Sequence, residues 1–235
     1  FNRERSHYTC PNLRFDDQLV EYYWKNSGML NIQTKRGCPY HCIYCTYPVI
    51  EGHTVRTLDA EKVVDALLRL KKSHGIDYVF FTDSVFNMQP AYNEELANRL
   101  IHSGVNIRWG AYFSPRGMDE KTMALFKKSG LVHVEFGTEA ISDRTLINYG
   151  KHFTVADIIE QSDICRRLDI DYAHFLILAG YGETDETVNE TFENSKLIPQ
   201  TVFFPFVGMR IYPGTPLYHI AVKEGVISDT DDLIE

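Results

Sequence analysis

The sequence of 235 residues is long enough to bury the core of one α/β domain, and 44% hydrophobic and 24% charged residues make an ordinary globular composition. A formal net charge of -8 gives no overall basic field, which argues against a nucleic-acid or anionic-membrane partner. No apolar run approaches the roughly 18 residues of a transmembrane segment. Three of the five cysteines lie in one short run, which indicates a reducing, cytoplasmic setting.

The two ends of the sequence indicate a piece of a longer protein. The sequence starts at Phe1 without a methionine and stops at Glu235 without a terminating motif. No repeat, low-complexity run or linker divides the residues between. We therefore expect an N-terminal extension over residues 1–29, a core over residues 30–218, and the start of a C-terminal segment over residues 219–235.

Short apolar or β-branched runs alternate along the core with longer amphipathic stretches. Strands are expected at residues 30–34, 78–82, 106–113, 132–137, 171–178 and 202–209. Helices are expected at residues 59–74, 93–103, 119–129, from near 143, at 155–168 and at 185–196. This alternation implies parallel strands joined by helical crossovers. It fits both a (β/α)6 partial TIM barrel and an open doubly wound sheet.

Three cysteines in the run Gly37-Cys-Pro-Tyr-His-Cys-Ile-Tyr-Cys-Thr46 are the most informative feature of the chain. Cys38, Cys42 and Cys45 bring three soft thiolates to one loop, whereas iron–sulfur clusters and many zinc sites use four ligands. The triad therefore suggests a [4Fe–4S] cluster with one iron open to a small molecule. Zinc stays an alternative if His41 or another residue supplies a fourth ligand. Three cysteines this close cannot pair completely as disulfides.

The spacing Cys38-x3-Cys42-x-Tyr44-Cys45, with an aromatic residue before the last cysteine, resembles the signature of the radical S-adenosylmethionine (SAM) enzymes. The resemblance implies that the amino and carboxylate groups of SAM chelate the open iron, with Tyr44 near the adenine. It implies that one electron from the reduced cluster cleaves a carbon–sulfur bond, and that the 5′-deoxyadenosyl radical takes a hydrogen from the substrate. It also favours the (β/α)6 partial TIM barrel, which leaves an opening for a large substrate.

Functional residues of parallel α/β barrels collect where the strands end. Asp83 follows the second strand, where many relatives carry a Gly-Gly-Glu-like motif that contacts the methionine amino group of SAM. The resemblance makes Asp83 a candidate substitute for that motif, although a turn or helix-capping role would also explain it.

Glu139 follows the fourth strand, at a position that faces SAM in the family that the chain resembles. A carboxylate there accepts hydrogen bonds from the ammonium or ribose hydroxyls of the cofactor. Lys151, twelve residues later, matches a position that pairs with the cofactor carboxylate in relatives. The alternative for Lys151 is an ordinary solvated lysine.

Two further residues follow the last two strands. Gly180 lies in a segment that resembles a family motif whose small residues let the backbone approach the adenine. Arg210 precedes a sharp turn and is a candidate for contact with an anion. The isolated cysteines and two histidines are interpreted as structural: Cys10, Cys165, His133 and His174.

The sequence thus predicts an enzyme that cleaves SAM reductively and modifies a small-molecule or lipid-like substrate, with flavodoxin or ferredoxin as the one-electron reductant. Within the superfamily it is most similar to members whose longer chains carry a cobalamin-binding domain. Cobalamin is therefore implied through a domain outside this sequence, with methylation or ring rearrangement as the outcome. A tRNA- or protein-modifying enzyme and a zinc-stabilised binding module without catalysis are the alternatives.

Overall fold

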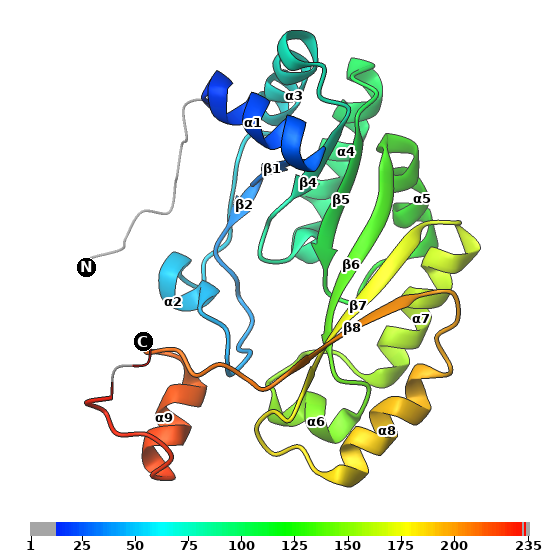
Figure 1. The fold of residues 1–235 in the computed structure, drawn as a ribbon. Helices are drawn as coiled ribbons and strands as arrows, with labels where there is room; N and C mark the ends of the chain where they lie inside the picture. Colours follow the sequence, from blue (N-terminus) through cyan, green and yellow to red (C-terminus); the bar gives the residue numbers. More distant parts are fainter. Residues whose placement is uncertain (1–12, 232, 234–235) are drawn as a thin grey trace.

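A single parallel sheet of six strands organises the chain (Figure 1). The computed structural model describes residues 13–231 and 233. The strands of the sheet are β1 (Leu30–Ile32), β4 (Tyr78–Phe81), β5 (Arg108–Phe113), β6 (Leu131–Glu139), β7 (Asp171–Leu178) and β8 (Val202–Val207). Neighbouring strands follow one another in chain order, and every pair is parallel. A doubly wound sheet would reverse its order at a switch point, so the partial barrel is confirmed.

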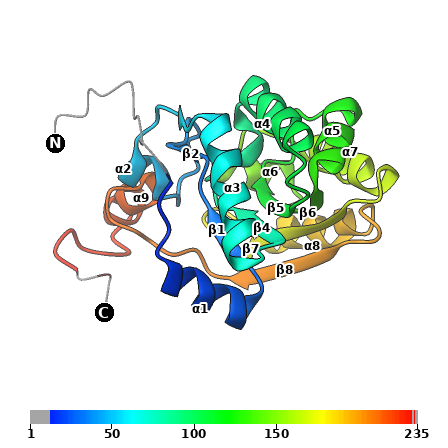
Figure 2. The same ribbon diagram turned by 90° about the horizontal axis from the view of Figure 1, so that it is seen from above.

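Helices cover one face of this sheet, as Figures 1 and 2 show from two directions. They are α3 (Ala60–His74), α4 (Pro90–Ser103), α5 (Glu120–Ser129), α7 (Val155–Arg167) and α8 (Asp185–Ser195). Between sheet and helices lies a continuous core that includes Val63, Phe81, Trp109 and Phe126, each at most 1% exposed. None of the described helices is both long and apolar enough to cross a membrane.

Local signals in the sequence set the helix ends. The Asp119 carboxylate accepts a hydrogen bond from the Thr122 amide, and α5 ends at Gly130. An acceptor before the first turn satisfies an amide that has no partner within the helix. The expected bounds of the 119–129 helix are therefore confirmed to within one residue, because both ends depend on residues adjacent to the helix itself.

Several elements were not expected from the pattern, among them helix α1 (Asp17–Ser27), the antiparallel pair β2 (Lys35–Arg36) and β3 (Arg56–Thr57), and the short helix α2 (Tyr47–Glu51). Helix α1 lies within the expected N-terminal extension and packs against β1. Together with α6 (Asp143–Asn148) and the 3-10 turn η1 (Phe86–Met88), these short elements connect or flank the six main units. Apart from α1, which has 11 residues, they are too short to carry a period that could be predicted.

Helix α9 (Pro216–Lys223) crosses the boundary that the sequence placed at residue 218. The Thr215 hydroxyl accepts from the Tyr218 amide and caps the helix, and proline occupies its first position. In both views α9 lies beside α2, on the side where the strands end (Figures 1 and 2). The expected turn after Arg210 thus leads into helix α9, which contacts the cysteine loop through the Leu217 amide.

Candidate functional site

The cysteine loop, residues 37–46, is anchored at its first residues by neighbouring backbone and side chains. The Gly37 amide donates to a Glu51 carboxylate oxygen at 2.9 Å, and the Gly37 carbonyl accepts from the Ser84 hydroxyl at 3.1 Å. The Cys38 amide donates to the Gly52 carbonyl at 3.1 Å. Ser84 follows β4, so the loop is attached to the ends of both β1 and β4.

The second half of the loop is held between α6 and α9. The Ile43 amide donates to the Tyr149 carbonyl at 3.1 Å, and the Ile43 carbonyl accepts from the Leu217 amide at 2.9 Å. Gly150 has a φ of +70°, and a Cβ there would lie 2.6 Å from the His41 carbonyl oxygen. Only glycine permits this approach, which brings the end of α6 against the loop.

The three thiols of the loop lie close enough to influence one another's ionisation. Burial is the main cause that raises their pKa values, that of Cys45 to about 11, while the nearby Lys151 ammonium lowers each of them. Cys38, Cys42, Cys45 and the remote Cys165 are all free thiols. A cation beside thiols favours the thiolates that bind iron.

The donor set fits a cluster better than a single metal ion. Among the described residues, no three His, Cys, Asp or Glu side chains are gathered closely enough to hold one ion. Zinc needs its sulfur ligands at about 2.3 Å from one centre, whereas three thiolates of a [4Fe–4S] cluster each bind a different iron. His41, the expected fourth zinc ligand, lies against the His53 ring at 5.1 Å between ring centres.

Glu139 and Lys151 form an ion pair beside the cysteine loop. Their side chains are 12% and 6% exposed, and the Lys151 ammonium also donates to the Gly137 carbonyl at 3.3 Å. Burial lowers the pKa of Lys151, but the charges of Glu139, Tyr44 and Cys42 outweigh it, so that the pKa is raised and the ammonium stays charged. Its nitrogen lies 5.5 Å from the centre of the Tyr44 ring. Four residues singled out from the sequence thus meet in one place.

The structure gives Asp83 a different role from the expected contact with SAM. Its carboxylate is fully buried and accepts from the Thr34 amide at 2.6 Å and hydroxyl at 2.6 Å, and from the Lys35 amide and ammonium, both at 2.8 Å. These four donors occupy both carboxylate oxygens. Asp83 therefore links the end of β4 to the segment that follows β1. Strand β1 ends at Ile32 rather than at the expected residue 34, because the amides of Thr34 and Lys35 donate to this carboxylate.

Gly180 and Arg210 lie at the ends of β7 and β8. A Cβ on Gly180 would lie 2.1 Å from the Tyr149 hydroxyl oxygen, so a tyrosine fills the space beside this glycine. The Arg210 side chain is exposed and donates to the Tyr212 hydroxyl at 3.3 Å. The adenine contact of Gly180 and the anion contact of Arg210 stay predictions.

Residues that sequence patterns did not single out complete the surroundings of the site. Tyr149 and Lys35 are fully buried partners of predicted residues, and His152 stacks on Tyr40 of the loop with ring centres 3.6 Å apart. Burial is the main cause that lowers the pKa of His152 to about 4. No motif could have identified these three, because each acts through a contact distant in the sequence.

The other isolated residues have structural surroundings. His174 is fully buried, stacks against Phe136 and accepts or donates one hydrogen bond to each of Thr138 and Ser162. Burial alone lowers its pKa to about 3. Cys165 lies buried in α7, whereas Cys10 lies outside the described residues. The structural interpretation of His174 and Cys165 agrees with these positions.

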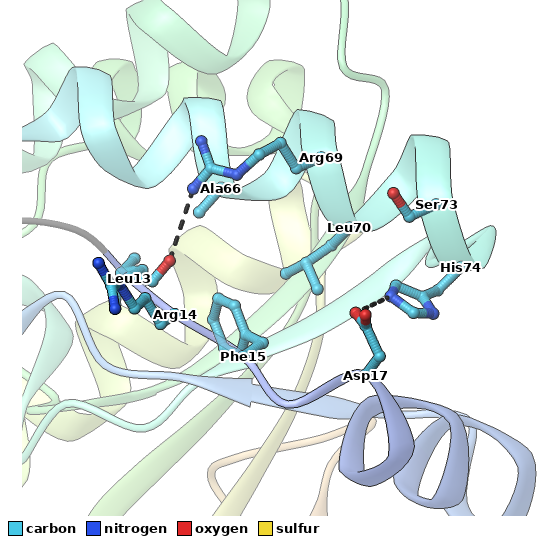
Figure 3. A pocket seen from close by; sticks show the side chains of 9 residues that line it. All are labelled: Leu13, Arg14, Phe15, Asp17, Ala66, Arg69, Leu70, Ser73 and His74. Atoms are coloured by element: carbon cyan, nitrogen blue, oxygen red, sulfur yellow. Dashed lines mark hydrogen bonds and ion pairs between the residues drawn. The ribbon is translucent and has the colours of Figure 1, made fainter.

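A cavity of about 450 Å³ lies between α3 and the segment that leads into α1 (Figure 3). Arg69 donates to the Leu13 carbonyl across it, and His74 pairs with Asp17 at 3.0 Å. Figure 1 places α1 at the end of the sheet opposite α6 and α9. The cavity is therefore separate from the cysteine loop, and no candidate site residue lines it.

Comparison with known proteins identifies the family. The model of the Radical SAM superfamily matches residues 32–194. The chain is 26% identical over 196 residues to the uncharacterized methyltransferase PH0819 of Pyrococcus horikoshii, covering 83% of this chain and 42% of that protein. It is 30% identical over 166 residues to the anaerobic magnesium-protoporphyrin IX monomethyl ester cyclase of Cereibacter sphaeroides, covering 67% of this chain and 26% of that protein.

A solved structure shares the fold. TsrM, a radical SAM methyltransferase from Kitasatospora setae with cobalamin and a [4Fe-4S] cluster bound, superposes with a TM-score of 0.81 at 26% identity, over 88% of this chain and 39% of that one. The chain thus spans less than half the length of these three proteins. A match over most of the sheet, with the cysteine loop in place, excludes the zinc-stabilised module. The chain belongs to the radical SAM superfamily.

Proposed function

We propose that this protein is a cobalamin-dependent radical SAM methyltransferase that acts on a small aromatic or apolar molecule. The relatives support the reaction, because PH0819 is described as a methyltransferase and TsrM is a methyltransferase with cobalamin bound. The magnesium-protoporphyrin cyclase supports a ring closure as a second candidate outcome. The magnesium-protoporphyrin ester in the name of the cyclase is a small molecule, which favours such a substrate over tRNA or protein.

The observation that carries the proposal is the buried Glu139–Lys151 pair beside Cys42 and Tyr44. SAM presents a carboxylate, an ammonium and ribose hydroxyls. Lys151 offers a charged donor for the carboxylate, and Glu139 offers acceptors for the ammonium or the hydroxyls. When bound at the three thiolates, the cluster would supply the electron that cleaves a carbon–sulfur bond of SAM.

The face of the sheet opposite the helices supports the class of substrate. Strand side chains alternate between faces, and on this face Phe80, Tyr112, Phe175 and Phe204 form a row whose neighbouring rings lie 4.8, 6.4 and 5.3 Å apart. Tyr112 is 38% exposed and Phe204 is 43% exposed. We call these four residues the aromatic row. The exposed rings of Tyr112 and Phe204 are of the kind that stacks on flat or apolar ligands, whereas Phe80 is 4% exposed and packs against Tyr112.

The third residue of the aromatic row, Phe175, lies next to the proposed cofactor site. Phe175 of β7 pairs with Gly137 of β6, and Glu139 follows two residues later. A substrate lying on the row would therefore reach the group held by Glu139 and Lys151. The row also supports a small molecule rather than a nucleic acid, since Tyr112 of the row pairs with Glu135 of β6, whose carboxylate disfavours a phosphate backbone.

The test is anaerobic reconstitution with iron and sulfide, followed by incubation with SAM and a strong one-electron reductant. We expect 5′-deoxyadenosine with methionine, or S-adenosylhomocysteine once a methyl group is transferred, and cobalamin in the purified full-length protein. Cys42→Ala should give neither product, and Cys165→Ala should give both. A cluster-loaded protein that binds no SAM would refute the proposal.

The substrate class is tested in the same assay. Aromatic small molecules, with tryptophan and protoporphyrin IX as probes, should raise SAM turnover, and Phe175→Ala should abolish that stimulation without changing SAM affinity. Stimulation by bulk tRNA but by no small molecule would instead support the RNA-modifying alternative.

A further inference from the structure

We infer that Tyr149 is a positioning residue that sets the cysteine loop and Tyr44 relative to the Glu139–Lys151 pair. The inference rests on the proposed function, because it assigns how the proposed SAM site is held in shape. Tyr149 is fully buried at the end of α6, two residues before Lys151. It contacts three separate parts of the site.

The backbone of Tyr149 holds the cysteine loop. Its carbonyl accepts the Ile43 amide at 3.1 Å, between Cys42 and Cys45. Buried amides seldom lack a partner, so this hydrogen bond fixes the position of the cysteine loop relative to the end of α6. The next residue, Gly150, lets the two backbones approach at the His41 carbonyl.

The side chain of Tyr149 holds the end of β7. Its hydroxyl donates to the Ile177 carbonyl at 3.3 Å, and its ring occupies the space that a Cβ on Gly180 would need. Gly180 is thus required by a residue of this chain, whatever ligand approaches it. The loop after β7 is drawn toward α6 as a result.

The same ring contacts Tyr44 edge to face, with 6.4 Å between ring centres and 82° between ring planes. Tyr44 in turn lies 5.5 Å from the Lys151 ammonium. Edge-to-face pairs constrain the orientation of both rings. Tyr149 therefore couples the aromatic residue before Cys45 to the charged pair.

The chain offers a matched control in Tyr172, at the other end of β7. It is 7% exposed, its hydroxyl donates to the Pro199 carbonyl at 2.5 Å, and its ring packs edge to face on Phe136 and His174. Tyr149→Leu and Tyr172→Leu both remove a buried ring and one hydroxyl–carbonyl bond. They should therefore lose similar unfolding free energy, measured by urea denaturation, and only Tyr149 should affect the site.

The first readout needs neither cluster nor SAM. We expect iodoacetamide to label Cys42 and Cys45 of the metal-free protein at least tenfold faster in Tyr149→Leu than in wild type or Tyr172→Leu, with mass spectrometry resolving each cysteine. The second readout is SAM affinity of the reconstituted protein. Tyr149→Leu should bind SAM about tenfold more weakly at normal iron content, and Tyr149→Phe, which keeps the ring, should stay within threefold of wild type.

The outcomes separate this inference from the proposed function. If wild type takes up iron but binds no SAM, the proposed function fails, and this inference fails with it. If wild type binds SAM and Tyr149→Leu matches Tyr172→Leu in labelling rate and SAM affinity, Tyr149 is only a packing residue and the inference alone is overturned. If Tyr149→Leu does not fold, Gly180→Ala replaces it in the iodoacetamide experiment, because its methyl group meets the hydroxyl and ring of Tyr149. Wild-type labelling rates of Cys42 and Cys45 in Gly180→Ala would then overturn the inference.

Discussion

The buried Lys35–Asp83 pair gives the sharpest stability prediction. Both side chains are fully buried and their charged atoms lie 2.8 Å apart. Asp83→Asn keeps an acceptor for the Thr34 and Lys35 amides but removes the negative charge, which leaves the Lys35 ammonium facing an amide. Breaking a buried pair by neutralising one partner costs about 3–5 kcal/mol. For a chain of this length that corresponds to a melting temperature lower by roughly 6–20 °C.

The double variant and the pH dependence show where this loss comes from. Lys35→Met with Asp83→Asn removes both charges, so most of the stability should return. Burial lowers the pKa of Lys35, and Asp83 opposes it. In Asp83→Asn the pKa of Lys35 in the folded protein therefore falls further below its pKa in the unfolded chain. Over the pH range between these two values, the unfolded chain binds one more proton than the folded protein. Stability of this variant should then rise with pH, and its deficit should be smaller at pH 9 than at pH 7.

Urea unfolding measures all three proteins, with Glu193→Gln as the control. Glu193 pairs with Lys196 at 2.7 Å, but the two side chains are 70% and 67% exposed, so its loss should cost no more than about 1 kcal/mol. An Asp83→Asn protein that unfolds like wild type yet binds SAM more weakly would refute the structural role of Asp83. It would restore the contact with the methionine amino group expected from the sequence.

Three further predictions concern the loop and the core. Anaerobic reconstitution should load about four irons, with Ala at Cys38, Cys42 or Cys45 abolishing the absorbance of the cluster and Cys165→Ala preserving it. Gly150→Ala should lower iron content more than Gly75→Ala, although both glycines have φ near +70°, because only the first added Cβ meets the loop; equal iron contents would contradict the close approach. The free energy of unfolding should fall by up to about 1.4 kcal/mol per pH unit as pH drops from 6.5 toward 3, because His174 takes up a proton in the unfolded chain but stays neutral in the folded protein, where its pKa is about 3. Urea unfolding at pH 7 and pH 5 should show a smaller pH dependence for His174→Gln than for wild type.

The fold was predictable because each strand–helix unit carries its own pattern. Apolar runs such as residues 78–82 need only neighbouring residues to be identified, and strict alternation then leaves few topologies. Choosing the barrel over the doubly wound sheet needed either the family resemblance or the strand order itself. The pair β2 and β3 was missed because two residues per strand provide no period to detect.

The site was predictable where chemistry depends on spacing along the chain. Cys38, Cys42 and Cys45 are local, and the offset between Glu139 and Lys151 is fixed by α6 between them. The role of Asp83 stayed open because its partner Lys35 lies on a different segment, and a carboxylate at a strand end has the same sequence signature whether it binds a ligand or a buried lysine. Which of the two applies depends on a tertiary contact that no local pattern encodes.

The contacts of Ile43 explain why the site needs nearly the whole length of this chain. Its amide donates to Tyr149 at the end of α6, and its carbonyl accepts from Leu217 of α9. Both backbone groups of this one loop residue therefore depend on segments that follow the fourth and sixth strands of the barrel. The family model ends at residue 194, before α9 begins. A loop that carries three thiolates cannot bury its own backbone groups within so few residues. The helices at the strand ends supply those partners, and this requirement connects the architecture of the partial barrel to the chemistry at its edge.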